Sequence, residues 1–332
     1  MWGYYGVPPE SPDGKRLCYA LYPEPIDLNR DERYPVYPAQ LWVCNIDGTR
    51  HRMLFKGSGS VHNGLLQSWV DDKRIVFVSD GAIRIIHADT GKIEFGPLKG
   101  FHCGHYARGG KVLLYKYPNA GSKQQGLHEF DTATDKMRLV LPHSKGIWHV
   151  QYSPDGRKAL FTTDGNTHLV VANLDGSGIK MFPSKKPMHF QWFDDQSFFG
   201  YAYQGVVGVD LNKHREYELY RWNLDGKVIE YLAGHGCHGA AREDGKYFAG
   251  ESWYQSKPIK LRLYAQGSRE PLLTIFSHSF DKVTWFNGGR HHVNPSFSRD
   301  GMRLYYNKAV NENTSHAFSY DLTGLVSPMQ TE

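Results

Sequence analysis

The chain carries the stretch Ser153-Pro154-Asp155-Gly156-Arg157, followed two residues later by Ala-Leu-Phe-Thr-Thr, as the clearest copy of a recurring phrase. An Asp-Gly pair between two apolar runs predicts a tight hairpin turn, because glycine accepts the positive φ angle that such a turn needs. Further copies begin at Ser11, Arg242 and Ser298, and weaker copies lie at 70–73, 108–111 and 193–196. A short aromatic-rich run follows each copy, so we expect a strand there.

A second phrase, typified by Asn-Leu-Asp-Gly at 173–176, alternates with the first. Its aspartates, at positions 47, 89, 131, 175 and 225, are spaced by 42, 42, 44 and 50 residues. Two hairpin turns in each unit of this length predict four strands, A to D, which is typical of a β-propeller blade. A β-sandwich with accidental internal similarity is the alternative.

The repeat predicts an all-β fold, a seven-bladed β-propeller. Because each blade buries its faces on its neighbours, we expect residues 1–332 to form a single domain. The expected blades are approximately 5–55, 60–99, 100–142, 146–184, 187–233, 235–277 and 289–326.

The composition excludes several other classes of protein. Among the 332 residues, 14% are aromatic, which can build a core and excludes a disordered chain. The glycines lack a three-residue period, and no apolar run approaches the roughly 18 residues of a membrane span. The net charge of +5 modestly favours an anionic partner. Basic and acidic residues are interspersed, so we expect no nucleic-acid binding, and we expect a monomer.

The four cysteines and the N-terminal sequence are relevant to the cellular compartment of the protein. Cys18, Cys44, Cys103 and Cys237 fit neither a zinc-ribbon nor a redox pattern. The first ten residues have no basic segment followed by an apolar one, so we expect no signal peptide in this sequence. We expect a secreted or periplasmic protein if a signal has been removed, and a cytoplasmic one otherwise.

The 17 histidines are not placed at random. His149, His189 and His238 each lie six residues before the aspartate of their turn, and Asn294 has the same offset in the last blade. His292 lies two residues before Asn294, on the same side of an extended strand. We therefore expect four successive blades to place an imidazole or an amide on one face. The alternative is that each histidine only bonds a backbone carbonyl of the next blade.

Clustered imidazoles predict a metal site or an acid/base pair. Cys237 and His291 adjoin two of these positions, and a thiolate with imidazoles suits a divalent metal, either zinc or manganese, with calcium as a further option. We assign His105, Arg290 and Trp285 to substrate binding, although tryptophans in propellers also pack between blades. Arg221 occupies a normally apolar slot and needs an anionic partner, which is either a substrate carboxylate or an internal acid.

Residues 289–301, which include Arg290-His291-His292-Val293-Asn294, resemble the last-blade motif of oligogalacturonate lyases. The run 189–226 is similar to the layout of the same family, and ulvan lyases look similar too. The resemblance implies that His189 is the base and that His238 and His292 bind a divalent metal. The chain has Asn294 where the family has a second histidine, which, with Cys237, leaves room for zinc and a different uronate.

These observations predict a polysaccharide or oligosaccharide lyase that acts on an anionic uronic-acid glycan, such as ulvan or pectin-derived oligogalacturonate, by metal-assisted β-elimination. We assign His189 as the base, His149 or Tyr203 as the acid, and Arg221 to the substrate carboxylate. The expected metal ligands are His238, His292 and Asn294, with Cys237 and His291 as further candidates. The alternative is a non-catalytic, TolB-like propeller that binds a glycan or a protein. We do not expect a serine hydrolase, because the sequence has no Gly-x-Ser-x-Gly elbow and no second domain is expected.

Overall fold

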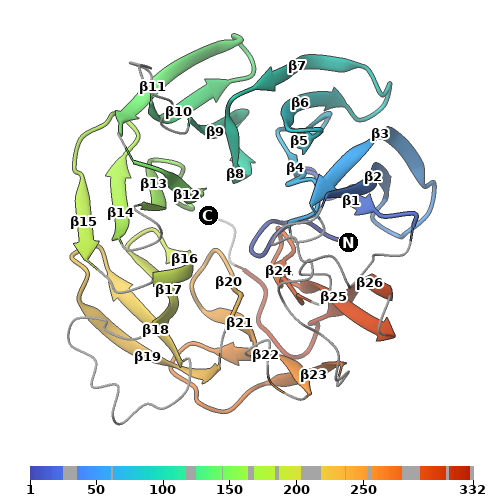
Figure 1. Cartoon of the computed structure of the whole chain (residues 1–332). Helices are drawn as coiled ribbons and strands as arrows, with labels where there is room; N and C mark the ends of the chain where they lie inside the picture. Colours follow the sequence, from blue (N-terminus) through green and yellow to red (C-terminus); the bar gives the residue numbers. More distant parts are fainter. Residues whose placement is uncertain are drawn as a thin grey trace. The chain divides into compact units, whose positions relative to one another are not determined.

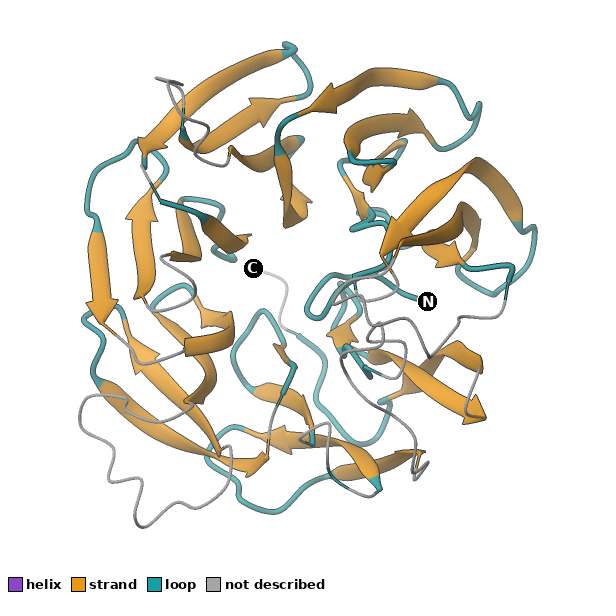
Figure 2. Ribbon diagram, viewed as in Figure 1, coloured by secondary structure: helices purple, strands orange, loops and turns teal. Residues whose placement is uncertain are grey.

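Strands make up all the regular structure of the computed structural model, and the residues that it describes contain no helix (Figures 1 and 2). The described residues are 1–24, 36–60, 63–116, 125–143, 145–163, 168–183, 187–202, 218–235, 237–252, 256, 258–278, 292–311 and 314–329. Within this part of the chain, no helix is long and apolar enough to cross a membrane.

The strands form seven antiparallel sheets, in chain order. The first sheet comprises β1 (Arg16–Leu21), β2 (Val36–Asn45) and β3 (Arg52–Ser60). The second comprises β4 (Ser68–Trp69), β5 (Arg74–Ser79), β6 (Ala82–His87) and β7 (Ile93–Lys99). The last comprises β24 (Ser296–Phe297), β25 (Arg303–Asn311) and β26 (Thr314–Asp321).

The middle sheets each contain four strands. They comprise β8 (His102–Arg108), β9 (Lys111–Lys116), β10 (Gly126–Asp131) and β11 (Lys136–Pro142); β12 (Ile147–Tyr152), β13 (Lys158–Thr163), β14 (His168–Asn173) and β15 (Lys180–Pro183); β16 (Pro187–Asp194), β17 (Ser197–Ala202), β18 (Glu218–Asn223) and β19 (Val228–His235); and β20 (Gly239–Ala241), β21 (Tyr247–Glu251), β22 (Ile259–Ala265) and β23 (Leu273–His278).

Each sheet is an up-and-down meander, and the fold class is therefore confirmed as an all-β, seven-bladed β-propeller. Five blades have the four strands that the repeat predicts. The first and last blades have three strands in the described part of the chain.

The chain divides into two compact units. Unit 1 consists of Met1–Lys99, Tyr254–Leu261 and Thr274–Glu332, and unit 2 of Gly100–Trp253 and Arg262–Leu273. The prediction of a single domain stays a prediction.

The Asp-Gly phrases form the tight turns that the sequence predicts. In the fourth blade, the Gly156 amide donates to the Ser153 carbonyl at 2.9 Å, and the Ser153 hydroxyl donates to the Asp155 carboxylate at 2.5 Å. Gly156 has a φ of 70°, which a residue with a Cβ adopts only at a cost. The turn also joins neighbouring blades, because the Asp155 amide donates to the carboxylate of Asp195 at 2.6 Å.

Apolar side chains fill the space between neighbouring blades. In unit 2, one core cluster includes Leu113 of the third blade and Phe161 of the fourth, and the next includes Leu160 of the fourth and Phe198 of the fifth. Burying a side chain of this size stabilises the fold by roughly 1.5–3 kcal/mol. Each blade therefore depends on its neighbours for stability.

The first strand of each blade, strand A, lies on the inner side of unit 2. Figure 1 shows β8, β12, β16 and β20 on this side, whereas β11, β15 and β19 lie on the outer side. The side-chain Nε2 of Gln151 in β12 donates to the backbone carbonyl of Phe190 in β16 at 2.6 Å, which joins two neighbouring strands A. Residues at the same register in these strands are therefore brought close together.

Candidate active site

Four histidines form a row across unit 2, one in each of four consecutive blades. His105 lies in β8, His149 in β12 and His189 in β16, and His238 directly precedes β20. The ring centroids are 5.5 Å apart for His105 and His149, and 5.5 Å apart for His149 and His189. The centroids of His189 and His238 are 4.2 Å apart. The structure brings together the three histidines that share one offset in the sequence, and it adds His105 to them.

The backbone turns these imidazoles out of the regular strand. The pairing of β12 with β13 shifts between Trp148 and Gln151, and that of β16 with β17 shifts between Met188 and Gln191. His149 and His189 lie inside these bulges with φ angles of 54° and 56°. A bulge redirects a side chain, and a non-glycine residue in the left-handed region is uncommon. Such a conformation, repeated in two blades, indicates a functional constraint.

Two imidazoles of the row, those of His105 and His149, are electrically neutral near pH 7. Burial, followed by the nearby imidazole of His238, lowers the pKa of His149 to about 4. Burial also lowers the pKa of His105 well below its usual value, with smaller effects from the imidazoles of His149 and His238. A neutral imidazole has a free lone pair, so it can accept a proton or bind a metal.

A buried group of potential metal ligands lies at one end of the row. Cys237, His238 and Glu251 each offer one ligand atom, and these atoms lie within 4.8 Å of one another. His238 Nδ1 is 2.7 Å from Glu251 Oε1, and the side chains are 0% and 2% exposed. Glu251 was not among the residues predicted from the sequence. The available signal was a carboxylate that ends the otherwise apolar run Tyr-Phe-Ala-Gly-Glu of β21.

The chemistry of this group fits a divalent cation. Burial, followed by the carboxylate of Glu251, raises the pKa of the Cys237 thiol well above its usual value. A buried carboxylate beside a thiol favours a positive charge between them. Thiolate, imidazole and carboxylate together are typical zinc ligands, whereas calcium prefers oxygen ligands alone. We therefore favour zinc among the predicted metals.

The predicted base, His189, has two further neighbours. Its Nδ1 is 3.5 Å from Cys237 Sγ, a distance that permits a weak hydrogen bond with sulfur. Its ring centroid is 5.6 Å from that of Tyr201, which is fully buried in β17. His189 is 7% exposed, so little water reaches it.

Two of the predicted ligands, His292 and Asn294, belong to unit 1. Both are buried, with exposed fractions of 5% and 1%, and both lie in the short segment that leads into β24. Asn294 has a φ of 46°, so it shares the left-handed backbone of His149 and His189. Asn294 therefore matches His149 and His189 in its backbone conformation as well as in its six-residue offset from the turn aspartate. The role of His292 and Asn294 as ligands stays a prediction.

The structure resolves the two alternatives for Arg221 in favour of an internal ion pair. Its guanidinium lies 2.5 Å from the Asp194 carboxylate and 3.2 Å from that of Glu230, and its side chain is 12% exposed. Asp194 ends β16, far along the strand from His189 near its beginning. This corrects the assignment of Arg221 to a substrate carboxylate, because its charge is already compensated inside the blade.

Four other residues assigned from the sequence lie outside the described part of the chain. They are Tyr203, Trp285, Arg290 and His291. Their roles stay predictions.

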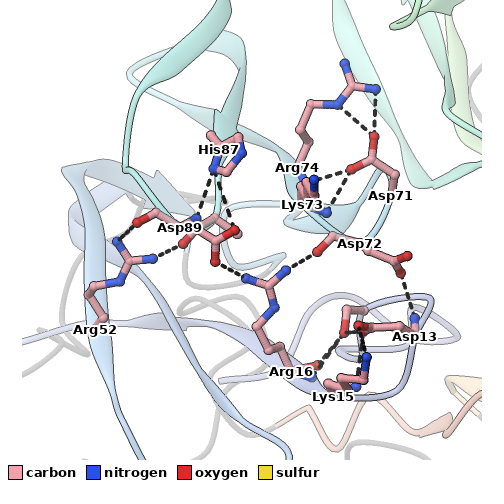
Figure 3. Close-up of polar contacts among 12 residues, drawn as sticks. Asp13, Lys15, Arg16, Arg52, Asp71, Asp72, Lys73, Arg74, His87 and Asp89 are labelled. Atoms are coloured by element: carbon pink, nitrogen blue, oxygen red, sulfur yellow. Dashed lines mark hydrogen bonds and ion pairs between the residues drawn. The ribbon is translucent and has the colours of Figure 1, made fainter.

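A second polar cluster lies in unit 1, where the first two blades meet (Figure 3). Arg16 pairs with Asp89 at 2.5 Å and also donates to the backbone carbonyl of Asp72. The carboxylate of Asp72 in turn accepts the Asp13 amide at 2.7 Å. Because these charges compensate one another and are partly exposed, we interpret the cluster as a structural link between blades.

Comparisons with known proteins place the chain by its fold. Neither a protein-family model nor a curated protein matches it. An oligogalacturonate lyase from Vibrio parahaemolyticus superposes with a TM-score of 0.67 at 13% identity, over 97% of this chain and 90% of the lyase. An oligogalacturonate lyase in complex with manganese gives 0.61 at 12% identity, over 98% and 100% of the two chains.

A third solved structure has a different activity. The dihydro-heme d1 dehydrogenase NirN superposes with a TM-score of 0.59 at 12% identity, over 99% of this chain and 66% of the dehydrogenase. Such low identities show the fold alone. They confirm that the chain resembles the propellers of oligogalacturonate lyases, as the sequence predicted.

Proposed function

We propose that this protein is a lyase that cleaves a uronic-acid-containing anionic glycan by metal-assisted β-elimination. The observation that carries the proposal is the row of closely spaced imidazoles, which ends at the potential metal ligands Cys237, His238 and Glu251. The fold similarity to oligogalacturonate lyases supports the same class of reaction.

The reaction needs the chemical groups that unit 2 provides. A uronate lyase removes the proton at C5, which is only weakly acidic because it lies next to a carboxylate. The negative charge that develops must be stabilised, a base must take the proton, and an acid must protonate the departing O4. A neutral histidine can serve as the base or, after protonation, as the acid.

We assign the proton transfers to two neighbouring members of the row. His189 takes the C5 proton, and the sulfur of Cys237 and the ring of Tyr201 hold its imidazole in place. The acid is His149 or Tyr203. The ring centroid of His149 is 5.5 Å from that of His189, and His149 must first take up a proton before it can donate one to O4, because its pKa of about 4 leaves it neutral near pH 7. His189 is buried and His149 is half-buried, so both groups have limited contact with water.

Cys237 and His238 would hold the metal, with His292, Asn294 and His291 as further ligands proposed from the sequence. When bound, the ion supplies positive charge that neutralises the uronate carboxylate. Arg290, Trp285 and His105 are proposed to bind the rest of the substrate. As a glycan lyase, the protein would act outside the cell or in the periplasm, or in the cytoplasm on imported oligomers.

The test uses purified protein, a divalent metal, and separate solutions of oligogalacturonate and ulvan. Elimination creates an unsaturated uronate, and we expect ultraviolet absorbance to rise with at least one polymer. His189→Ala lowers the rate about 100- to 10,000-fold, as expected for loss of a general base, while bound metal stays. His168→Ala, in β14 outside the row, is the matched control and keeps the rate.

Two results would contradict the proposal. Absence of any absorbance change on uronic-acid polymers, with metal supplied, would reject the lyase. If the purified protein also lacked stoichiometric metal, the non-catalytic binding propeller would be the better account. Loss of metal from His189→Ala would show that the roles within the row are wrong.

A further inference from the structure

Gly146 is a glycine whose backbone does not require glycine. It directly precedes β12, and its φ angle lies outside the left-handed region that favours this residue. A Cβ added to Gly146 would lie 2.4, 2.9 and 2.9 Å from its three nearest neighbours, and all three are ring atoms of Trp148. The missing side chain at Gly146 therefore makes room for the indole of Trp148.

Hydrogen bonds from β13 hold the backbone on both sides of this contact. The hydroxyl of Thr163 donates to the Gly146 carbonyl at 2.8 Å, and the hydroxyl of Thr162 donates to the Trp148 carbonyl at 3.4 Å. Both threonines are 1% exposed. The indole is thus held in place before any ligand arrives, which reduces the entropy that a ligand must lose on binding.

Trp148 differs from the other tryptophans described in unit 2. Trp192 and Trp222 are 5% and 4% exposed, and both belong to the core cluster that joins the fourth and fifth blades. Trp148 is half-buried, and neither of the two core clusters described above includes it. Packing between blades therefore explains the first two tryptophans but not Trp148, which keeps part of its ring surface in contact with solvent.

Trp148 adjoins the row of imidazoles. It directly precedes His149, whose ring centroid is 5.5 Å from those of its two neighbours in the row. In the sixth blade, Cys237 has the same place before His238, and its sulfur lies 3.5 Å from His189. The residue before a histidine of the row can therefore reach the site, and a glycan bound at His149 would lie beside Trp148.

We infer that Trp148 is a substrate-binding residue, whose indole packs against a sugar ring next to the scissile bond. The inference rests on the glycan site of the proposed function. One side of a sugar ring carries C–H groups and is apolar, and an indole offers it a large, rigid apolar surface. Gly146 is a positioning residue, because it acts only through the indole that it accommodates.

The test measures glycan binding by calorimetric titration of metal-loaded His189→Ala, which leaves the ligand uncut. The probes are oligogalacturonate and oligosaccharides of ulvan. Adding Trp148→Ala should weaken binding of at least one probe about 10-fold, as expected for loss of an aromatic anchor, and Trp148→Phe should restore part of the loss. Tyr231→Ala is the matched control, because it removes a half-buried aromatic side chain from the outer strand β19.

A double-mutant cycle tests the role of Gly146. Gly146→Ala keeps the indole but displaces it, so it should weaken binding when Trp148 is present and have no further effect in Trp148→Ala. In the protein with His189 intact, Trp148→Ala should raise KM and leave kcat unchanged, because stacking is the same before and in the transition state.

Three results would overturn the inference. They are an unchanged affinity in Trp148→Ala, an equal loss of affinity in Tyr231→Ala, and binding of neither probe by the protein. A further loss from Gly146→Ala in the absence of the indole would show that Gly146 acts by another route and would overturn its positioning role.

The outcome is separable from that of the proposed function. A protein that binds an oligouronide with the expected dependence on Trp148 but forms no unsaturated product would reject the lyase and leave the sugar contact standing. A protein that forms this product with an unchanged KM in Trp148→Ala would reject the sugar contact and leave the lyase standing.

Discussion

The neutrality of His149 should make the fold sensitive to acid in a defined pH range. Its pKa is about 4 in the folded protein and near 6.5 in an unfolded chain. Between these values the unfolded state binds more protons, so the free energy of unfolding falls as the pH falls. This difference in pKa contributes at most about 3 kcal/mol to the free energy of unfolding, and about 2 kcal/mol of that contribution is lost when the pH falls to about 5. Above about pH 7.5 the contribution is constant.

The matched variant is His149→Asn, which removes the titrating group. Asparagine tolerates the left-handed backbone, and Asn294 already adopts it at the equivalent position with a φ of 46°. Urea unfolding of both metal-free proteins at about pH 7.5 and about pH 5 measures the difference. We expect the unchanged protein to lose about 2 kcal/mol more than the variant. Equal losses would refute the assignment of a lowered pKa to His149, because the variant lacks this titrating group.

Three other predictions concern stability and metal. Arg221→Met should lower the free energy of unfolding by roughly 2–3 kcal/mol, because it leaves the carboxylates of Asp194 and Glu230 without their cation. The loss is limited because both carboxylates keep some contact with water. Unchanged zinc binding in this variant would agree with the distance of Arg221 from the histidine row. Gly156→Ala should cost about 1 kcal/mol in urea unfolding, because its φ of 70° strains a residue with a Cβ; no change would contradict the turn geometry. Chelation should lower the melting temperature of the zinc-loaded protein, as measured by calorimetry, since the ion binds only the folded state. Cys237→Ser should reduce this change in melting temperature. An equal change in that variant would exclude the sulfur of Cys237 as a ligand.

The repeat in the sequence was sufficient to predict the blades. Hairpin turns depend on local residues, and the Ser153 to Gly156 turn forms as expected from its Asp-Gly pair. The same local register aligned His149, His189 and His238, because strands A of neighbouring blades pack side by side in unit 2. Histidines with the same offset from their turns therefore lie next to one another in the folded protein.

The sequence could not predict what lies opposite each histidine. Glu251 is 13 residues after His238 and meets it only because β20 and β21 pair in one register. Arg221 likewise finds Asp194 and Glu230 across neighbouring strands of its own blade. Cross-strand partners depend on register and on bulges, and a strand pattern in the sequence does not specify where the bulges fall.

The most direct test of the proposed reaction is the mass of its products. A purified oligouronide is incubated with the metal-loaded protein, and the two fragments from a single cleavage are weighed by mass spectrometry. Elimination predicts fragments whose masses sum to that of the substrate, with one fragment unsaturated at its new end. Fragments that sum to the substrate plus one water would show hydrolysis, and an intact substrate would show no cleavage; either result would contradict the lyase.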